Sequence, residues 1–347
     1  MLYNNKTAQD VLKNDDLIVI TGAGGFIGGA LTRRFHEQGF THLRAVDRKP
    51  LYEWYQRTPG VESLCLDLSE RKNAERAAEG AVEVYNLAAD MGGMGFIETH
   101  RVECLRSVLI NTHMIEAAYK AGAKRYFYSS SACAYNTLLQ QSPDVVALKE
   151  ADAYPAMAER GYGWEKLISE MFCQEYWEER GLETHIARFH NIFGPNGTWF
   201  GGREKAPAAI CRKVIEAKES GKLEIDIWGT GEQTRSFCFI DDCTAGIDMI
   251  THCDALIATP TNLGSHEMVS INQLVSLAEE IGGVKLERSY QLDAPKGVAG
   301  RNSDNTFIQS VLGWQPGTPL RAGLEKTYHW IEEQYALRKA GMRVVRD

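Results

Sequence analysis

Three polar residues near the middle of the chain have the types and spacing needed to oxidise an alcohol. Tyr162 and Lys166 lie four positions apart in a segment expected to be helical, so their side chains share one face. The lysine charge can lower the pKa of the tyrosine phenol, and the phenolate can then take a proton from a hydroxyl group. Ser131, in the serine-rich segment 129–133, would bind the same hydroxyl. We therefore expect hydride transfer from an alcohol, which requires a hydride acceptor.

A glycine-rich motif offers a site for such an acceptor. The motif directly follows a short apolar, strand-like run and directly precedes a helical segment. Gly22 permits a tight turn, Gly25 lets the backbone approach a pyrophosphate, and Gly28 allows close packing of helix and strand. The N-terminus of the following helix supplies free N–H groups and a positive partial charge, and Phe26 and Ile27 of the motif are expected to contact the cofactor. This context predicts that the motif binds a dinucleotide.

Residues after the next strands are expected to hold the rest of the dinucleotide. Asp47 follows the motif by 19 residues, where a carboxylate can bind ribose hydroxyls and repel a 2′-phosphate. This position favours NAD over NADP, with Arg48 beside it partly offsetting the preference. Asp67 and Leu68 should reach the adenine edge, and a plain surface turn is the alternative for this pair. Ala88, after the fourth strand, completes the predicted cofactor contacts.

Alternating strands and helices must position these residues. The expected strands are residues 17–20, 43–46, 63–66, 82–87, 125–129 and 185–189, and the expected helices are 30–38, 71–78, 107–120 and 165–179. Such alternation predicts an α/β fold with a Rossmann-type doubly wound parallel sheet. Beyond residue 190 we expect a strand at 236–240 and helices at 208–218, 242–250, 271–281 and 320–338.

Two interleaved lobes are expected, because no linker rich in proline or serine separates the halves of the chain. Residues 1–190 plus about 236–265 would form the NAD-binding Rossmann domain, and about 191–235 plus 266–347 a smaller C-terminal substrate lobe. A ligand would bind in the cleft between them.

Composition excludes several other classes of protein. The chain has 347 residues, of which 44% are hydrophobic and 24% charged, as in an ordinary globular protein. The net charge of −8, with the two signs interspersed, argues against nucleic-acid binding. The apolar runs are too short to span a membrane and the N-terminus lacks a signal-peptide core, so we expect a cytoplasmic protein. The eight cysteines form no C-x-x-C pair, so no metal site is expected.

The glycine motif, the serine strand and the Tyr162–Lys166 pair together resemble the extended short-chain dehydrogenase/reductase family. The resemblance covers nearly the whole chain, including the late segment 313–316. It implies that Tyr162 and Lys166 are the catalytic pair, that Ser131 assists them, and that the substrate is a nucleotide sugar. Two residues depart from the common pattern of the family, namely Asn86 and Glu165.

Longer segments resemble the GDP-mannose 3′,5′-epimerase subgroup of that family. They are residues 88–97, 188–191, 201–209, 233–237 and 300–304. The subgroup implies that Cys133 and Lys205 exchange protons at the sugar ring. A base role requires a lowered pKa, toward which Lys166 and NAD⁺ would push the cysteine. Which of the two is the base stays open. Glu204, next to Lys205, could neutralise that lysine.

Cations must also meet the substrate diphosphate, and Arg235, Arg301 and Lys213 are the candidates. The resemblance further implies a substrate site that contains Ser131, Cys133 and the following residues: Gly92, Ala132, Asn191, Glu204, Lys205, Ala206, Gln233 and Thr234.

The expected function is NAD-retaining epimerisation of GDP-mannose at C3 and C5, to GDP-L-galactose, with GDP-L-gulose from inversion at C5 alone. Another nucleotide-sugar epimerase or dehydratase, including one that acts on a GDP-heptose, is the alternative within the family. A non-catalytic nucleotide-binding protein is the alternative outside it. The resemblance to the family also implies a homodimer, with an interface formed by the helices at 107–120 and 165–179.

Overall fold

The central element of the fold is a seven-stranded sheet. The computed structural model describes residues 6–295 and 297–342. The strand order is β11-β6-β5-β4-β1-β2-β3, and every neighbouring pair is parallel. The strands are β1 (Ile18–Thr21), β2 (Leu43–Asp47), β3 (Glu62–Cys65), β4 (Glu83–Asn86), β5 (Arg125–Ser131), β6 (Glu183–Phe189) and β11 (Pro260–Leu263). The order reverses between β1 and β4, which confirms the predicted doubly wound α/β fold.

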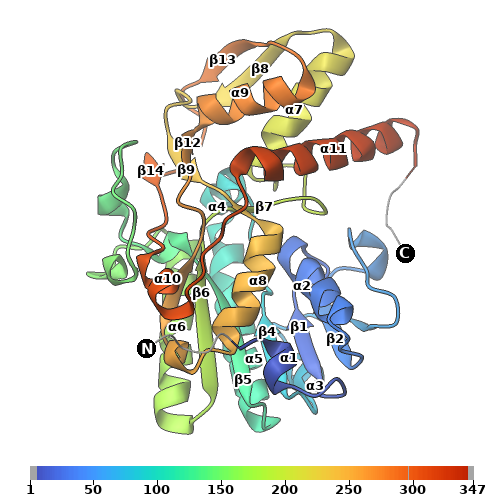
Figure 1. Ribbon diagram of the computed structural model, residues 1–347, viewed down its shortest axis with the longest axis vertical. Coiled ribbons are helices and arrows are strands. Elements are labelled where there is room, and N and C mark those ends of the chain that lie inside the picture. Colours follow the sequence, from blue (N-terminus) through green and yellow to red (C-terminus); the bar gives the residue numbers. More distant parts are fainter. Residues whose placement is uncertain (1–5, 296, 343–347) are drawn as a thin grey trace.

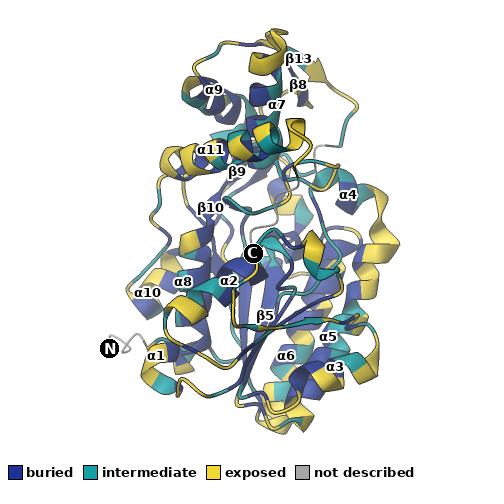
Figure 2. Ribbon diagram, turned by 90° about the vertical axis from the view of Figure 1, so that its right-hand side faces the viewer, coloured by how far each residue is buried: buried dark blue, intermediate teal, exposed yellow. Residues whose placement is uncertain are grey.

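Helices cover both faces of this sheet (Figure 1). One face carries α2 (Phe26–Glu37) and α8 (Ile240–Thr251), and the other carries α3 (Arg71–Ala78), α5 (Arg101–Lys120) and α6 (Tyr162–Arg180). Successive residues of a strand point to opposite faces, so Ile18 and Ile20 pack in one core and Val19 in the other. Figure 2 shows the sheet as a buried layer between helices that are exposed on their outer sides.

A smaller layer lies over one end of the sheet, at the top of Figure 1. Its helices α7 (Ala206–Ser220), α9 (Ile271–Gly282) and α11 (Leu320–Lys339) pack together beside the parallel pair β8 (Glu224–Trp228) and β13 (Glu287–Gln291). Two further small sheets join the layers. They contain β9 (Thr234–Ser236) between β12 (Met268–Ser270) and β14 (Gly300–Arg301), and β7 (Ile192–Phe193) beside β10 (Cys238–Phe239). The division of the chain into two lobes at the expected boundaries stays a prediction.

The predicted elements are largely found, with differences at their ends. The strand expected at 236–240 is found only in part, because β9 ends at Ser236, β10 covers Cys238–Phe239 and α8 already begins at Ile240. The apolar run there continues across the boundary, and acidic residues occupy the first turn of α8, where the helix dipole favours them. The short helix α4 (Met94–Thr99) lies in a segment for which no helix was predicted. Glycine lowers helix propensity, which concealed both α4 and the first turn of α2.

The remaining helices are short. They are α1 (Ala8–Val11) and α10 (Thr306–Leu312), with 3₁₀ turns at Leu51–Glu53, Ala132–Ala134, Thr137–Gln140, Glu150–Ala153 and Asp254–Leu256. Of the helices in the described part of the chain, none combines the length and the apolar character that crossing a membrane requires.

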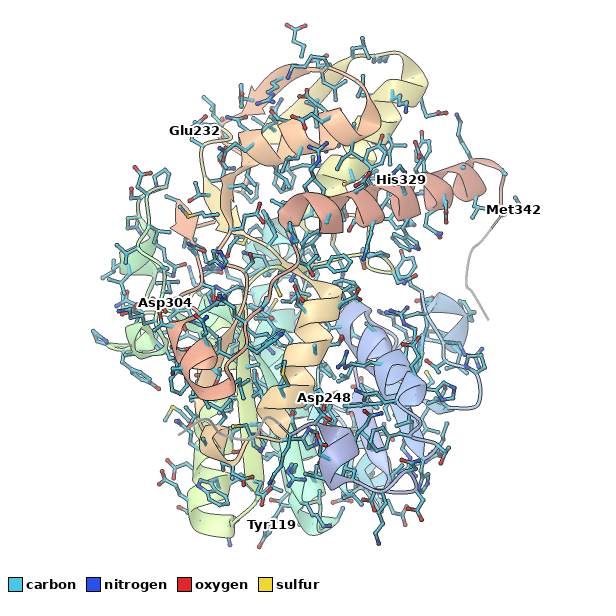
Figure 3. The ribbon with its side chains drawn as sticks, viewed as in Figure 1. Tyr119, Glu232, Asp248, Asp304, His329 and Met342 are labelled. Carbon is cyan, nitrogen blue, oxygen red and sulfur yellow. The ribbon has the colours of Figure 1, made fainter. Side chains whose placement is uncertain are left out.

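A buried charged cluster ties α8 to the sheet at the end away from the small layer. His252 Nε2 lies 3.1 Å from Glu83 Oε1, and His252 Nδ1 lies 3.2 Å from Asp248 Oδ1. Figure 3 marks Asp248 on α8 beside α2. Arg125 Nη1 lies 3.0 Å from Glu83 Oε1, and the buried His185 ring lies nearby. Burial alone would lower the pKa of His252, but its hydrogen bonds to Asp248 and Glu83 outweigh burial and raise the pKa to about 9.

The stability of the fold should therefore fall in mildly alkaline solution. A folded pKa near 9 against the ordinary 6.5 means that protonated His252 stabilises the fold below pH 6.5, an effect lost as pH rises through 9. This shift of the His252 pKa from 6.5 to about 9 corresponds to a contribution of roughly 3 kcal/mol to the free energy of unfolding. Urea titrations at pH 6.5 and 9.5 should show this loss in the native chain and not in His252→Gln. Replacement of the exposed His36 by glutamine provides the control, and this variant should lose stability as the native chain does. An equal loss of stability in His252→Gln would contradict the role assigned to His252.

Candidate functional site

The glycine motif forms a backbone cradle between β1 and α2. Gly22 has φ +70°, and a Cβ added to it would lie 2.7 Å from the Leu87 carbonyl oxygen. A Cβ on Gly28 would lie 2.4 Å from the Gly22 carbonyl oxygen, and one on Gly25 would lie 2.9 Å from the same atom. Only glycine fits at these three positions, because backbone and not flexible side chains would meet the added atom. The cradle opens at the N-terminus of α2, where free N–H groups attract a phosphate.

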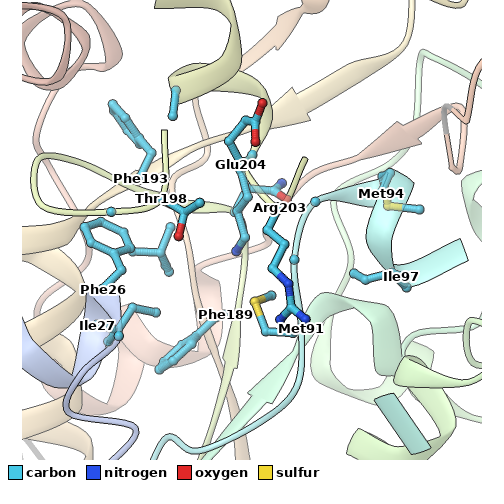
Figure 4. Close-up of a pocket in the computed structure, with 18 of the residues that line it drawn as sticks. Phe26, Ile27, Met91, Met94, Ile97, Phe189, Phe193, Thr198, Arg203 and Glu204 are labelled. Atoms are coloured by element: carbon cyan, nitrogen blue, oxygen red, sulfur yellow. The ribbon is translucent and has the colours of Figure 1, made fainter. Parts of the chain in front are cut away.

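One cavity of about 580 Å³ extends from this cradle to the small layer. Its lining includes the predicted residues Gly22, Gly25, Phe26, Ile27, Gly28, Asp47, Arg48, Asp67, Leu68, Ala88, Gly92, Ser131, Ala132, Cys133, Tyr162, Lys166, Asn191, Glu204, Lys205, Ala206, Lys213, Gln233, Arg235 and Arg301. Figure 4 shows that its walls come from distant segments, with Phe26 at the start of α2, Met91 after β4 and Arg203 before α7. The cradle and the cavity beyond it fit a dinucleotide with a second ligand next to it.

Thr234 is the exception among the predicted site residues. It is not part of the cavity lining, and its hydroxyl donates to the Pro143 carbonyl oxygen at 2.5 Å. Its predicted contact with the substrate stays a prediction. Alternate residues of a strand point to opposite sides, so Thr234 of β9 faces away from the cavity that Gln233 and Arg235 line.

Charged residues at the expected ribose position favour NAD. Asp47 is buried, and its Oδ1 accepts a hydrogen bond from the Lys49 backbone N at 2.9 Å. Arg48, the residue that could have accommodated a 2′-phosphate, instead pairs with Asp90, with 3.0 Å between Nη2 and Oδ2. The Asp67 carboxylate accepts hydrogen bonds from the backbone and hydroxyl of Ser69 at 2.9 and 2.7 Å. Asp67 thus stabilises a turn at the edge of the cavity.

The residues expected to oxidise the alcohol meet where β5 ends. Ser131 is the last residue of β5, and its Oγ accepts a hydrogen bond from the Cys133 backbone N at 3.2 Å. Tyr162 and Lys166 lie in the first turns of α6, with the Lys166 amine 5.4 Å from the centre of the Tyr162 ring. The Lys166 amine donates to the Ser129 carbonyl oxygen at 2.9 Å, which holds α6 against β5.

The expected lowering of the tyrosine pKa is wrong for this arrangement. Burial raises the pKa of Tyr162 well above its ordinary value, and the nearby Cys133 and Glu165 add to the effect. The Lys166 charge is shared with Glu165, whose Oε2 lies 3.8 Å from the amine.

Cys133 and Lys205 reach the same cavity from different layers. Cys133 lies in the 3₁₀ turn after β5, and Lys205 is the residue that precedes α7. Burial, followed by the Glu159 carboxylate, raises the pKa of Cys133 to about 11, and Arg301 opposes them. Arg301 is the cation in direct contact with the thiol, with 3.4 Å between its Nη1 and the sulfur, whereas the Lys166 amine donates to the Ser129 carbonyl oxygen. Burial lowers the pKa of Lys205, which brings the amine closer to the neutral form that can accept a proton.

Glu204 does not neutralise Lys205. Its Oε1 lies 3.1 Å from Arg212 Nη2, and its Oε2 accepts a hydrogen bond from the Gly202 backbone N at 2.7 Å. No hydrogen bond or ion pair of the Lys205 amine is found among residues 6–295 and 297–342. Lys205 is therefore free to meet a ligand in the cavity.

Two contacts across the cavity were not anticipated from the sequence. Asp90 pairs with Arg203 at 2.9 Å as well as with Arg48, and Arg203 lies 3.8 Å from the centre of the Phe96 ring. The second contact joins Arg301 to Glu159 and Cys133. Neither had a local sequence signal, because the partners are far apart in the chain.

The chain is similar in sequence and fold to several known proteins. The family model described as NAD dependent epimerase/dehydratase family matches residues 18–264. A GDP-mannose 3,5-epimerase of Arabidopsis thaliana is 45% identical over 324 residues, which cover 93% of this chain and 84% of that protein. The structure of MoeE5 in complex with UDP-glucose and NAD has a TM-score of 0.75 and 26% identity, covering 92% of this chain and 99% of its own. A UDP-glucose 4-epimerase of Thermotoga maritima shares the fold, with a TM-score of 0.80, 21% identity and coverages of 92% and 99%.

Asp47 should control the choice between the two dinucleotides. Asp47→Asn is expected to weaken NAD binding by roughly 10- to 100-fold, because a hydrogen bond to a charged group contributes about 1.5–3 kcal/mol. It should weaken NADP binding much less, since the repulsion of the 2′-phosphate is lost as well. Calorimetric titration with both dinucleotides measures the ratio of affinities, and an unchanged ratio would remove Asp47 from cofactor selection.

Proposed function

This chain belongs to the NAD dependent epimerase/dehydratase family, and on that premise we propose that it epimerises GDP-mannose at C3 and C5. The products would be GDP-L-galactose and, from inversion at C5 alone, GDP-L-gulose. The proposal rests on one observation above all: Cys133 and Lys205, two groups able to exchange protons, line the same cavity as Ser131, Tyr162 and Lys166. A simple 4-epimerase has no need for the first two.

The first step of the proposed reaction is oxidation at C4 of the sugar. NAD held by the glycine cradle and Asp47 would supply hydride transfer at C4 in both directions, so that no net oxidation would occur. Ser131 binds the C4 hydroxyl, and Tyr162 takes its proton. Lys166 holds α6 against β5 through the Ser129 carbonyl and adds positive charge beside the phenol. Reversal of these proton transfers restores the hydroxyl.

The resulting ketone makes the second step feasible. A proton on C3 or C5 becomes acidic once C4 is a carbonyl, because the carbanion is stabilised as an enolate. Cys133 and Lys205 stand on different layers of the cavity, so one can remove a proton from one face and the other can return a proton to the opposite face. A reduction at C4 then completes the epimer.

The small layer would hold the rest of the nucleotide sugar. Arg235 and Lys213 line that part of the cavity and, with Arg301, are proposed to meet the diphosphate. Lys213 already donates to the Asp226 carbonyl oxygen at 2.7 Å, which fixes its amine near the cavity wall. Trp228 also lines the cavity and offers an apolar face to a base.

Incubation of the protein with GDP-mannose in D₂O tests the proposal. Proton NMR and mass spectrometry should show deuterium at C3 and C5 together with new isomers. Cys133→Ala should still oxidise C4 but lose most exchange at both carbons. Tyr162→Phe should show no exchange at all, because without the ketone neither proton is acidic.

Other results of the exchange experiment would contradict parts of the proposal. Deuterium at C5 alone would replace the proposal by a C5 epimerase. No exchange by NAD-loaded protein would overturn GDP-mannose as the substrate, and GDP-heptoses would be tested next. Unchanged exchange in Cys133→Ala would remove the cysteine from the mechanism.

We also propose that the protein is a homodimer formed through α5 and α6. These helices pack side by side, and their outer faces are exposed (Figure 2). The exposed residues are Val102, Leu105, Leu109 and Tyr119 on α5, and Trp164, Ile168, Met171 and Trp177 on α6. A second copy would cover this surface, since monomeric proteins rarely expose a large contiguous apolar patch.

Charges placed on this surface should separate the subunits. The double variant Leu105→Glu, Ile168→Glu is expected to sediment as a monomer at micromolar concentration, because each carboxylate would have to be desolvated at the interface. Leu223→Glu alters an exposed leucine of the small layer and should remain a dimer. Sedimentation velocity measures both variants, and a dimeric double variant would place the interface elsewhere.

A further inference from the structure

A buried carboxylate stands beside the predicted proton-transfer cysteine. Glu159 precedes α6, and its backbone N donates to the Cys133 carbonyl oxygen at 3.0 Å. Its side chain is largely buried and pairs with Arg301, with 2.5 Å between Oε1 and Nη2. Its negative charge also acts on the Cys133 thiol and raises the pKa of that thiol. Neither the family motifs nor the proposed mechanism assigns it a role.

Arg301 is held by three separate contacts. Its Nη2 donates to Glu159, its Nη1 lies 3.4 Å from the Cys133 sulfur, and its Nε donates to Gln140 Oε1 at 2.7 Å. Gln140 is itself fixed, since its side-chain N donates to the Asn136 carbonyl oxygen at 3.2 Å. The planar guanidinium therefore has one orientation, in which it contacts both the Glu159 carboxylate and the Cys133 sulfur.

The two members of the pair act on the sulfur in opposite directions. Arg301 favours the thiolate, and Glu159 favours the protonated thiol. Arg235, the partner of Arg301 across β9 and β14, adds a second buried cation that interacts with Glu159. Without the Glu159 carboxylate, the Cys133 thiol would be next to the two cations Arg235 and Arg301, with no negative charge from this cluster to oppose them.

We propose that Glu159 is a positioning residue for Cys133: with Arg301 it fixes the sulfur at the cavity and keeps its proton in place. The inference deepens the proposed function, because a cysteine that exchanges protons at a sugar ring must be held in one position and one charge state between turnovers. Arg301 keeps N–H groups beyond these three contacts, which leaves it able to meet a substrate.

Alkylation of Cys133 tests this proposal without any substrate. NAD-loaded protein is treated with iodoacetamide over a range of pH, and the Cys133 peptide is quantified by mass spectrometry. Glu159→Gln removes the anion, so the midpoint of alkylation should move to lower pH by about one unit or more. At pH 8 the rate should then rise at least about tenfold, because the thiolate is the reactive form.

Three comparisons make the result specific. Glu159→Asp keeps the charge and should restore most of the native midpoint. Arg301→Lys loses the contact with the sulfur and should move the midpoint to higher pH, which provides a test of opposite sign if Glu159→Gln does not fold. Glu279→Gln removes a buried, ion-paired carboxylate of α9, away from the cavity, and should leave the midpoint unchanged.

The outcomes separate this inference from the proposed function. A native midpoint in folded Glu159→Gln would overturn the role of Glu159, and so would an unchanged midpoint in Arg301→Lys. Either result would leave the exchange experiment with GDP-mannose unaffected. Conversely, a shifted midpoint with no exchange on GDP-mannose would retain the positioning of Cys133 and reject only the substrate.

Discussion

A chain of buried polar side chains runs from the end of β1 to α6. The Thr21 hydroxyl donates to Asn86 Oδ1 at 2.8 Å, and Asn86 Nδ2 donates to Asn111 Oδ1 at 2.9 Å. Asn111 Nδ2 in turn donates to Glu165 Oε1 at 2.5 Å. Thr21 directly precedes the glycine cradle, and Glu165 lies between Tyr162 and Lys166. Unmade hydrogen bonds in such a buried site are costly, so the network fixes the cradle and the catalytic helix relative to each other.

This constraint explains the two departures from the family pattern. Asn86 and Glu165 are partners of Asn111, which bonds to both. Close backbone packing completes the arrangement at the same helix. A Cβ on Gly163 would lie 2.2 Å from the Cys133 carbonyl oxygen, so the residue after Tyr162 has no room for a side chain. Helix α6 thereby brings the tyrosine, the lysine and the turn that carries the cysteine to one point.

The wall of the cavity formed by the loop after β4 and the segment before α7 is held by backbone contacts and ion pairs. The Gly93 backbone N donates to the Arg203 carbonyl oxygen at 3.0 Å, and a Cβ on Gly93 would lie 2.4 Å from the Glu204 carbonyl oxygen. Asp90 adds ion pairs to Arg48 and Arg203. The loop after β4 thus touches the segment that carries Lys205. Small residues at this crossing allow the two layers to approach closely enough for Cys133 and Lys205 to share one cavity.

The features that could be predicted from the sequence are those that depend on residues close together in the chain. The alternation of strands and helices, the glycine turn and the four-residue spacing of Tyr162 and Lys166 each depend on backbone geometry within a short segment. The tertiary structure alone decided that Thr234 faces away from the cavity and that Arg301 contacts Cys133. Glu159 and Arg301 are separated by 142 positions and meet because β14 pairs with β9 beside the turn after β5. The charge states of Tyr162 and Cys133 likewise depend on burial and on distant partners, which no local spacing encodes.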